Sequence, residues 1–84
     1  MYKIEIYVKL KKDVLDPQGK AIAQAAKSLN IKDLIEVKQG KYFEIIINNV
    51  NDIKGVKSVG NQISKKLLCN EVIEDYEVIS IKKV

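Results

Sequence analysis

The chain has 84 residues, 46% of them hydrophobic, and its fifteen basic and eleven acidic side chains give a formal net charge of +4. This length allows a single domain, residues 1–84, whose core is small enough that an oligomer would usefully extend its burial. Every basic residue is a lysine. Because arginine makes most bidentate contacts to phosphate and guanine, nucleic-acid binding is not expected.

The composition also limits the chemistry that the chain can perform. It has no histidine and one cysteine, Cys69, which excludes an internal disulfide, a cysteine-only metal site and the usual general base near neutral pH. No apolar run is long enough to span a membrane, and Lys3 and Glu5 interrupt any signal-peptide pattern. We therefore expect a cytoplasmic protein that makes no contact with a membrane.

The first half of the chain predicts a strand followed by a helix. Tyr2–Leu10 alternates between apolar and mostly polar residues, as in a strand with one buried face. Asp16 is placed to cap the helix that follows, and Pro17 suits the first helical position. Apolar residues at helical spacing extend this helix to Leu29, and Asn30 favours a stop there.

The second half predicts two strands, a second helix and a last strand. We expect strands over Leu34–Lys38 and Tyr42–Asn48, joined by a hairpin turn at Gln39-Gly40-Lys41. A helix over Asp52–Leu68 follows, and then a strand over Glu71–Ile81. The order β-α-β-β-α-β predicts an α+β, ferredoxin-like fold, in which an antiparallel sheet carries both helices on one face.

Three segments, in a fixed order, resemble a known family. They are Val14–Ala21 (VLDPQGKA), Gly40–Ile45 (GKYFEI) and Lys66–Tyr76 (KLLCNEVIEDY). With them the chain resembles, over nearly its whole length, the PurS family, the small subunit of phosphoribosylformylglycinamidine synthase. One departure is Cys69-Asn70-Glu71, which stands where family members usually have Ala-Asn-Pro, and we expect it to loosen the entry to the last strand.

The resemblance implies a role in purine synthesis, in which formylglycinamide ribonucleotide, ATP and glutamine become formylglycinamidine ribonucleotide, ADP, phosphate and glutamate. It implies two partners: a large subunit that binds ATP and Mg²⁺, and a glutaminase subunit that releases ammonia. A PurS-type subunit would join the two and help ammonia to cross between them. No catalytic, cofactor or metal site is expected in this chain, and keeping ammonia from bulk water does not require one.

Three other features could carry chemistry, and each has a simpler structural interpretation. Gly55 and Gly60 have the spacing of a phosphate loop, but the Lys and the Ser or Thr required after the second glycine are absent, which favours an ordinary helix. Cys69 has no base to activate it, which favours a small apolar residue at a helix end. The acidic run Glu71–Glu77 favours a solvated edge or ion pairs with a partner over a metal or acid–base site.

The turn that opens the first helix is the best candidate for recognising a partner or ligand. Lysines surround it and an anion could bind the helix start, whereas a solvated basic loop is the simpler alternative. The candidates for docking a larger subunit are Asp16, Pro17, Gln18, Gly19 and Lys20. A function of a different class stays open as well: a regulatory domain of the same fold that binds a small ligand, such as an amino acid, at this turn.

We expect the sheet face that the helices leave free to form a homodimer or a dimer of dimers. This face combines lysines and glutamates with a group of aromatic and apolar side chains. The group consists of Tyr7, Tyr42, Ile46, Tyr76 and Val78. Tyrosine and isoleucine clustered on an exposed sheet face are typical of an interface, so we expect pairing through this face or by exchange of its strands.

Overall fold

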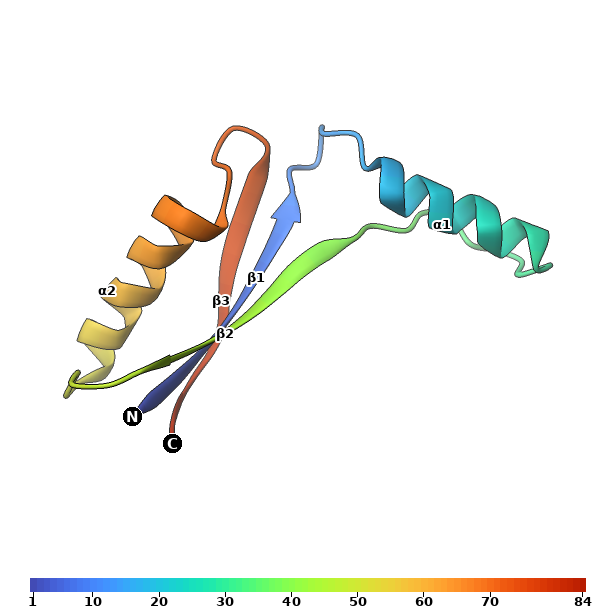
Figure 1. The fold of residues 1–84 in the computed structure, drawn as a ribbon. Coiled ribbons are helices and arrows are strands. Elements are labelled where there is room, and N and C mark those ends of the chain that lie inside the picture. The colour runs from blue at the N-terminus through green and yellow to red at the C-terminus, as the bar shows by residue number, and fades with distance from the viewer.

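A three-stranded antiparallel sheet forms the body of the molecule in the computed structural model, which describes all 84 residues (Figure 1). Its strands are β1 (Tyr2–Leu10), β2 (Gly40–Ile47) and β3 (Glu74–Lys83). The order is β2-β1-β3, so β1 is central, and its inward side chains are completely buried. These side chains are Ile4, Ile6 and Val8. The predicted first strand is confirmed, with its bounds and its buried face.

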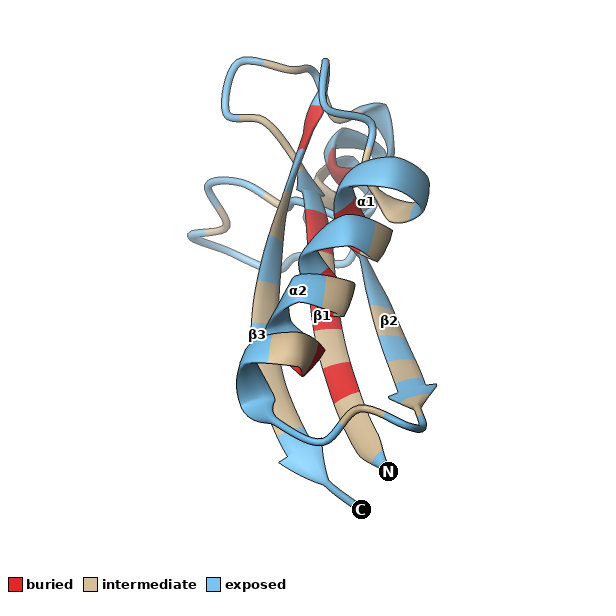
Figure 2. Cartoon of the chain, turned by 90° about the vertical axis from the view of Figure 1, so that its left-hand side faces the viewer, coloured by how far each residue is buried: buried red, intermediate tan, exposed pale blue.

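Helix α2 (Ile53–Ile63) covers one face of the sheet, over β1 and β3 (Figure 2). The carboxylate of Asp52 caps this helix by accepting a hydrogen bond from the backbone N–H of Gly55 at 2.7 Å. A five-residue π-helical turn, Ser64–Leu68, continues the helix and widens its last turn. The helix predicted over Asp52–Leu68 is therefore confirmed.

The core lies between α2 and the sheet and is small. Val56 is completely buried, and Gly60 lies so close to the sheet that a Cβ atom there would meet the Ile4 side chain at 3.4 Å. Because α2 lies over β1 and β3, the same face of β2 is only partly covered. The partly buried side chains of β2 are Phe43, Ile45 and Ile47. The apolar face of β2 is thus less completely covered than that of β1.

The first helix leaves the sheet instead of covering it. α1 (Pro17–Ser28) extends away from the end of β1, and residues 29–39 return beside it to β2 (Figure 1). We call residues 11–39 the arm. With the arm extended, the molecule measures 51 × 28 × 15 Å. Leu29 caps the end of α1, and Asn30 follows with a φ of 61°, so the predicted end of this helix is confirmed.

The prediction that both helices lie on one face of the sheet is wrong for α1. This helix packs on its own return chain through Gly19 and Ala26, and Gly19 lies directly against the carbonyl of Val37. Glycine and alanine allow an extended chain to approach the helix closely, whereas they offer little apolar area to a sheet. The larger apolar residues of α1, Ile22 and Leu29, stay 48% and 73% exposed.

The strand predicted over Leu34–Lys38 does not form, and the predicted turn at Gln39-Gly40-Lys41 is not a hairpin. The segment runs along α1 in the arm, where no strand lies beside it to complete a ladder. Gly40 instead opens β2 opposite Lys9, and a Cβ atom there would clash with the ring of Tyr7. Glycine is therefore needed for close approach of the ring, and the observed order is β-α-β-α-β.

Two residues assigned to the free face of the sheet lie on the face of α2. Tyr76 pairs with Val8 and donates a hydrogen bond from its hydroxyl to Asn61 Oδ1 on α2 at 3.2 Å. Val78 pairs with the buried Ile6. The prediction failed because β3 contains a register shift after Val78, which places Glu77 and Ser80 on the free face in their stead.

Candidate functional site

The turn at the base of the arm is held together by the carboxylate of Asp16. Oδ1 accepts a hydrogen bond from the backbone N–H of Gly19 at 2.9 Å, which confirms the predicted helix cap. Oδ2 accepts one from the backbone N–H of Gln39 at 2.8 Å, where the chain returns from the arm. Both hydrogen bonds lower the pKa of Asp16, and the bond from Gln39 has the larger effect. One side chain thus ties the outgoing chain to the returning chain.

The other four docking candidates divide into an inner and an outer set. Gly19 is buried against the return chain, where any side chain would collide with the carbonyl of Val37. Pro17 opens the helix, and Pro17, Gln18 and Lys20 are exposed. The structure therefore gives the turn an internal role through Asp16 and Gly19, while docking through its exposed residues stays a prediction.

A crevice separates this turn from the end of the sheet. Asp16 and Glu74 both line it, and Glu74 is 9% exposed. One carboxylate oxygen of Glu74 accepts a hydrogen bond from the backbone N–H of Asn70 at 2.8 Å, and the other lies 3.7 Å from Lys41 Nζ. Both carboxylates that face the crevice are thus engaged by groups of the chain itself.

The other residues that could have carried chemistry have structural roles. Gly55 and Gly60 lie within α2, as the helix interpretation predicts. The Cys69 thiol donates to the carbonyl of Glu74 at 3.4 Å, and burial, followed by the nearby carboxylates of Glu74, Asp75 and Glu71, raises its pKa. A protonated thiol is a poor nucleophile. Nowhere do three or more His, Cys, Asp or Glu side chains gather so that they could hold a metal ion.

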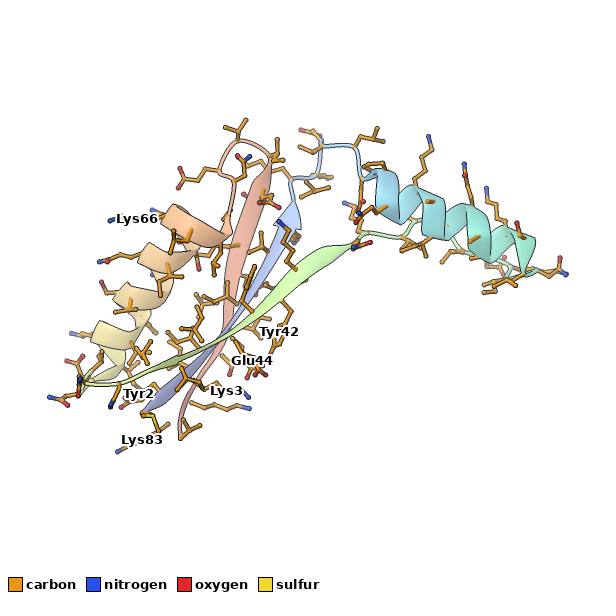
Figure 3. All side chains as sticks on the ribbon, viewed as in Figure 1. Tyr2, Lys3, Tyr42, Glu44, Lys66 and Lys83 are labelled. Carbon is orange, nitrogen blue, oxygen red and sulfur yellow. The ribbon has the colours of Figure 1, made fainter.

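The free face of the sheet is a network of polar side chains. Lys3 and Glu44 form an ion pair at 3.3 Å across β1 and β2, on the side of the sheet away from α2 (Figure 3). Glu5 accepts hydrogen bonds from the hydroxyls of Tyr42 and Ser80, which lower the pKa of Glu5, and the bond to Glu5 raises the pKa of Tyr42. Of the predicted interface group only Tyr7, Tyr42 and Ile46 lie on this face.

The arm exposes several large apolar side chains that were not among the residues predicted to form an interface. Its exposed large side chains are Leu15, Ile22, Leu29, Ile31 and Ile35. Ile35 is 97% exposed and Leu29 73% exposed. The helical spacing of Ile22 and Leu29 was visible in the sequence, but it was expected to face the sheet. A helix stripe left this exposed within its own chain is typical of a surface that another molecule covers.

Comparison with known proteins identifies the family. The PurS family model, described as phosphoribosylformylglycinamidine (FGAM) synthase, matches residues 3–82. The chain belongs to the PurS family. The subunit PurS of phosphoribosylformylglycinamidine synthase from Methanocaldococcus jannaschii is 42% identical over 84 residues, 100% of this chain and 99% of the relative. The subunit PurS from Bacillus subtilis is 41% identical over 76 residues, 90% of this chain and 88% of the relative.

Solved PurS structures share the fold. Methanocaldococcus jannaschii PurS superposes with a TM-score of 0.88 at 38% identity, over 100% of this chain and 99% of that one. Bacillus subtilis PurS gives 0.85 at 38% identity, over 99% and 100%. A chain in the structure of PurLQS from Thermotoga maritima gives 0.82 at 20% identity, over 99% and 96%, a likeness of fold alone. The α+β class and the PurS resemblance are thus confirmed, and the antiparallel sheet has three strands.

No helix in the PurS-like chain is both long enough and apolar enough to cross a membrane.

Proposed function

We propose that this chain is the small, non-catalytic subunit of phosphoribosylformylglycinamidine synthase in purine synthesis. The observation that carries the proposal is the match to relatives named as subunit PurS of this synthase, at 41% and 42% identity over nearly the whole of both chains. In the cytoplasm, the chain joins a large subunit, which binds ATP and Mg²⁺, to a glutaminase subunit, which releases ammonia. It helps the ammonia to reach formylglycinamide ribonucleotide without entering bulk water.

The state of the reactive side chains supports a non-catalytic role. The carboxylates of Glu5, Asp16 and Glu74 accept hydrogen bonds from neighbouring groups, and the Cys69 thiol has a raised pKa. A general base or nucleophile needs a free, correctly ionised group beside the reacting atom. These residues are better suited to holding the turn and the sheet in shape, so the contribution of the chain is to position its partners.

We also propose that the chain acts as a homodimer in which the arm of one copy packs on the sheet of the other. The arm exposes Ile22 and Leu29, and the apolar face of β2 is only partly covered within the chain. Packing one on the other would bury both surfaces at once and enlarge a small core. The free sheet face is the weaker candidate, because its charges and hydroxyls already bond to one another.

Reconstitution tests the assembly role. We expect the large and glutaminase subunits to perform glutamine-dependent synthesis only when this chain is added, and to lose at least about tenfold in rate without it. Glutaminase activity and ATP hydrolysis should be measured in the same mixtures, since they separate a loss of coupling from a loss of either enzyme. Equal glutamine-dependent rates with and without the chain would contradict the proposal.

A further inference from the structure

The whole net charge of the chain resides on one helix. The segment Ile53–Leu68, which comprises α2 and its π turn, contains four lysines and no acidic residue. The rest of the chain holds eleven basic and eleven acidic residues, so it is electrically balanced. The four lysines are Lys54, Lys57, Lys65 and Lys66, all exposed. We call their surface the lysine face of α2.

Most of the lysine face is turned away from the sheet, and Lys57 at its edge also borders a hollow lined by Val78–Ile81 of β3. The buried side of α2 carries Val56 and Gly60, whereas the lysines share a shallow surface hollow with polar residues. The polar residues are Ser58, Asn61 and Gln62. Figure 3 shows Lys66 pointing outward from the end of α2, away from the strands. At 1.5 Å per residue, the face is about 16 Å long from Lys54 to Lys65.

Nothing within the chain neutralises this face. The four ion pairs of the structure involve other lysines: Lys3, Lys38, Lys41 and Lys82. The helix dipole favours Lys65 and Lys66 near the end of the helix, but it opposes Lys54 in the first turn, where acidic residues are absent. Lys54 and Lys57 also repel each other across one helical turn. The stability of the isolated helix therefore does not account for the two lysines near its start.

We propose that the lysine face of α2 docks against an acidic surface on one of the two larger synthase subunits. This inference rests on the assembly role proposed above and names the surface that performs it. An elongated row of flexible ammonium groups suits a row of carboxylates on a protein, where it gives speed of association and orientation. Burial of the row against a balanced or basic surface would leave its charges unpaired, which is costly.

Other anionic partners fit this face less well. It has no arginine for bidentate phosphate contacts and no aromatic side chain on which bases could stack. A second copy of the chain offers an acidic run, Glu71–Glu77, but Glu74 within that run is buried and engaged with Asn70 and Lys41. Nucleic acid and a second copy are therefore tested as competing occupants.

The test compares two double variants of the full-length chain with the same charge change. Lys54→Glu with Lys57→Glu, which we call the row variant, reverses two charges of the lysine face near the start of α2. The helix dipole favours acidic residues there, so this variant is expected to keep its fold. Lys9→Glu with Lys83→Glu reverses two exposed lysines that lie outside both the lysine face and the arm and form no ion pair, and this variant is the matched control. Binding of each variant to the large subunit and to the glutaminase subunit is titrated separately in about 50 mM and about 1 M salt.

We expect the row variant to bind one of the two subunits at least about tenfold more weakly than wild type in low salt, and the control to stay within about threefold. In 1 M salt, where charges are screened within about 3 Å, the difference should nearly vanish. Thermal midpoints and sedimentation of the three isolated chains should agree.

Four results would overturn the inference. The first two concern affinity: the row variant binds both subunits as tightly as wild type, or the row variant and the control weaken binding equally. The third is a change of sedimentation in the row variant alone, which would point to a second copy of the chain. The fourth is binding of a single-stranded oligonucleotide that depends on these lysines while the affinity for the subunits is unchanged. A wild-type chain that binds neither subunit would overturn the proposed function together with this inference. A wild-type chain that binds, beside a row variant that binds equally well, would overturn this inference alone.

Discussion

Carboxylates that each serve two partners hold this small molecule in shape. Asp16 joins the start of α1 to Gln39. Glu5 accepts hydrogen bonds from the hydroxyls of Tyr42 on β2 and Ser80 on β3. Hydrogen bonds to an ionised acceptor are stronger than neutral ones, and all of these except the local bond from Gly19 join segments far apart in the chain. A domain with few buried side chains gains order in this way where its core is thin.

The Asp16 contacts predict a dependence of stability on pH. Hydrogen bonds from Gln39 and Gly19 hold the pKa of Asp16 below its ordinary value of 3.8, so the ionised carboxylate stabilises the fold fully above that value and loses its effect as the pH falls through the lowered pKa. Asp16→Asn keeps one acceptor oxygen and turns an N–H group toward the other donor. We expect its thermal midpoint to lie about 5 °C below wild type near neutral pH.

Thermal unfolding of both proteins from neutral to strongly acidic pH checks this prediction. The midpoint difference should shrink in acid, because the wild type then loses its carboxylate as well. Gln18→Ala, an exposed change in the same turn, serves as the control and should follow the wild type at every pH. Parallel curves for wild type and Asp16→Asn across the whole range would contradict the contribution assigned to the ionised group.

At the scale of elements, the arm is the feature that most needs a second molecule. α1 has an inner face of glycine and alanine that its return chain fills, and an outer stripe with Ile22 and Leu29 that nothing fills. Helices in proteins owe most of their stability to packing of an apolar face rather than to propensity. α1 is therefore expected to gain its stable position when a copy of the chain covers the stripe.

Two aspartate substitutions distinguish the arm from the free sheet face as the dimer interface. Ile22→Asp would bury a carboxylate under the proposed partner sheet, and we expect it to raise the dimer dissociation constant at least about a hundredfold. Ile46→Asp places the same charge on the free face, opposite Lys3, and should leave the dimer intact. Sedimentation of both variants and wild type over a range of concentrations measures this. Dissociation by Ile46→Asp alone would assign the interface to the free face, as the sequence first indicated.

Local features of the fold could be predicted from the sequence and long-range ones could not, for a physical reason. The cap at Asp16, the alternation of Tyr2–Leu10 and the stripe of α2 are local signals, and each was predicted correctly. The direction of α1 and the absence of a strand at Leu34–Lys38 depend on what lies beside those segments. A one-residue register shift in β3 reversed the faces of Tyr76 and Val78, and its only mark in the sequence is the adjacent apolar pair Val78-Ile79, which breaks the alternation.

The candidate site was predictable to the same extent. The five residues of the turn were found because they adjoin one another in the sequence, and the cap among them is a known local motif. The bond from Gln39, 23 residues away, and the exposed stripe of the arm appear only once the arm is seen to extend. The lysines of α2 were counted in the net charge, but their place on one outward face required the helix to be positioned.

In the whole molecule the arm and α2 lie at opposite ends. The arm extends from one end of the sheet, and α2 with its lysine face lies on the other side of the strands (Figure 1). In the proposed dimer the partner's arm packs on β2 beside α2, and the outward side of α2, which carries the lysine face, stays open to a larger subunit. This separation suits a connector, since its contacts with itself and with its partners do not compete for one surface.

A connector of this kind should become dispensable when ammonia is supplied directly. The large subunit is proposed to hold the ATP chemistry, and this chain is proposed to bring it ammonia from the glutaminase subunit without loss to water. We therefore expect the large subunit alone, given ammonium salt in place of glutamine, to make product at a rate that rises with pH as the fraction of free ammonia rises. Adding this chain should change that rate by less than about twofold, whereas it should raise the glutamine-dependent rate of the three-subunit mixture at least about tenfold. Product formation is measured with and without the chain under both nitrogen sources, and ATP hydrolysis serves as the control for an intact large subunit. An ammonium-dependent rate that needs this chain as much as the glutamine-dependent one does would show that the chain completes the synthetase site itself rather than connecting two sites.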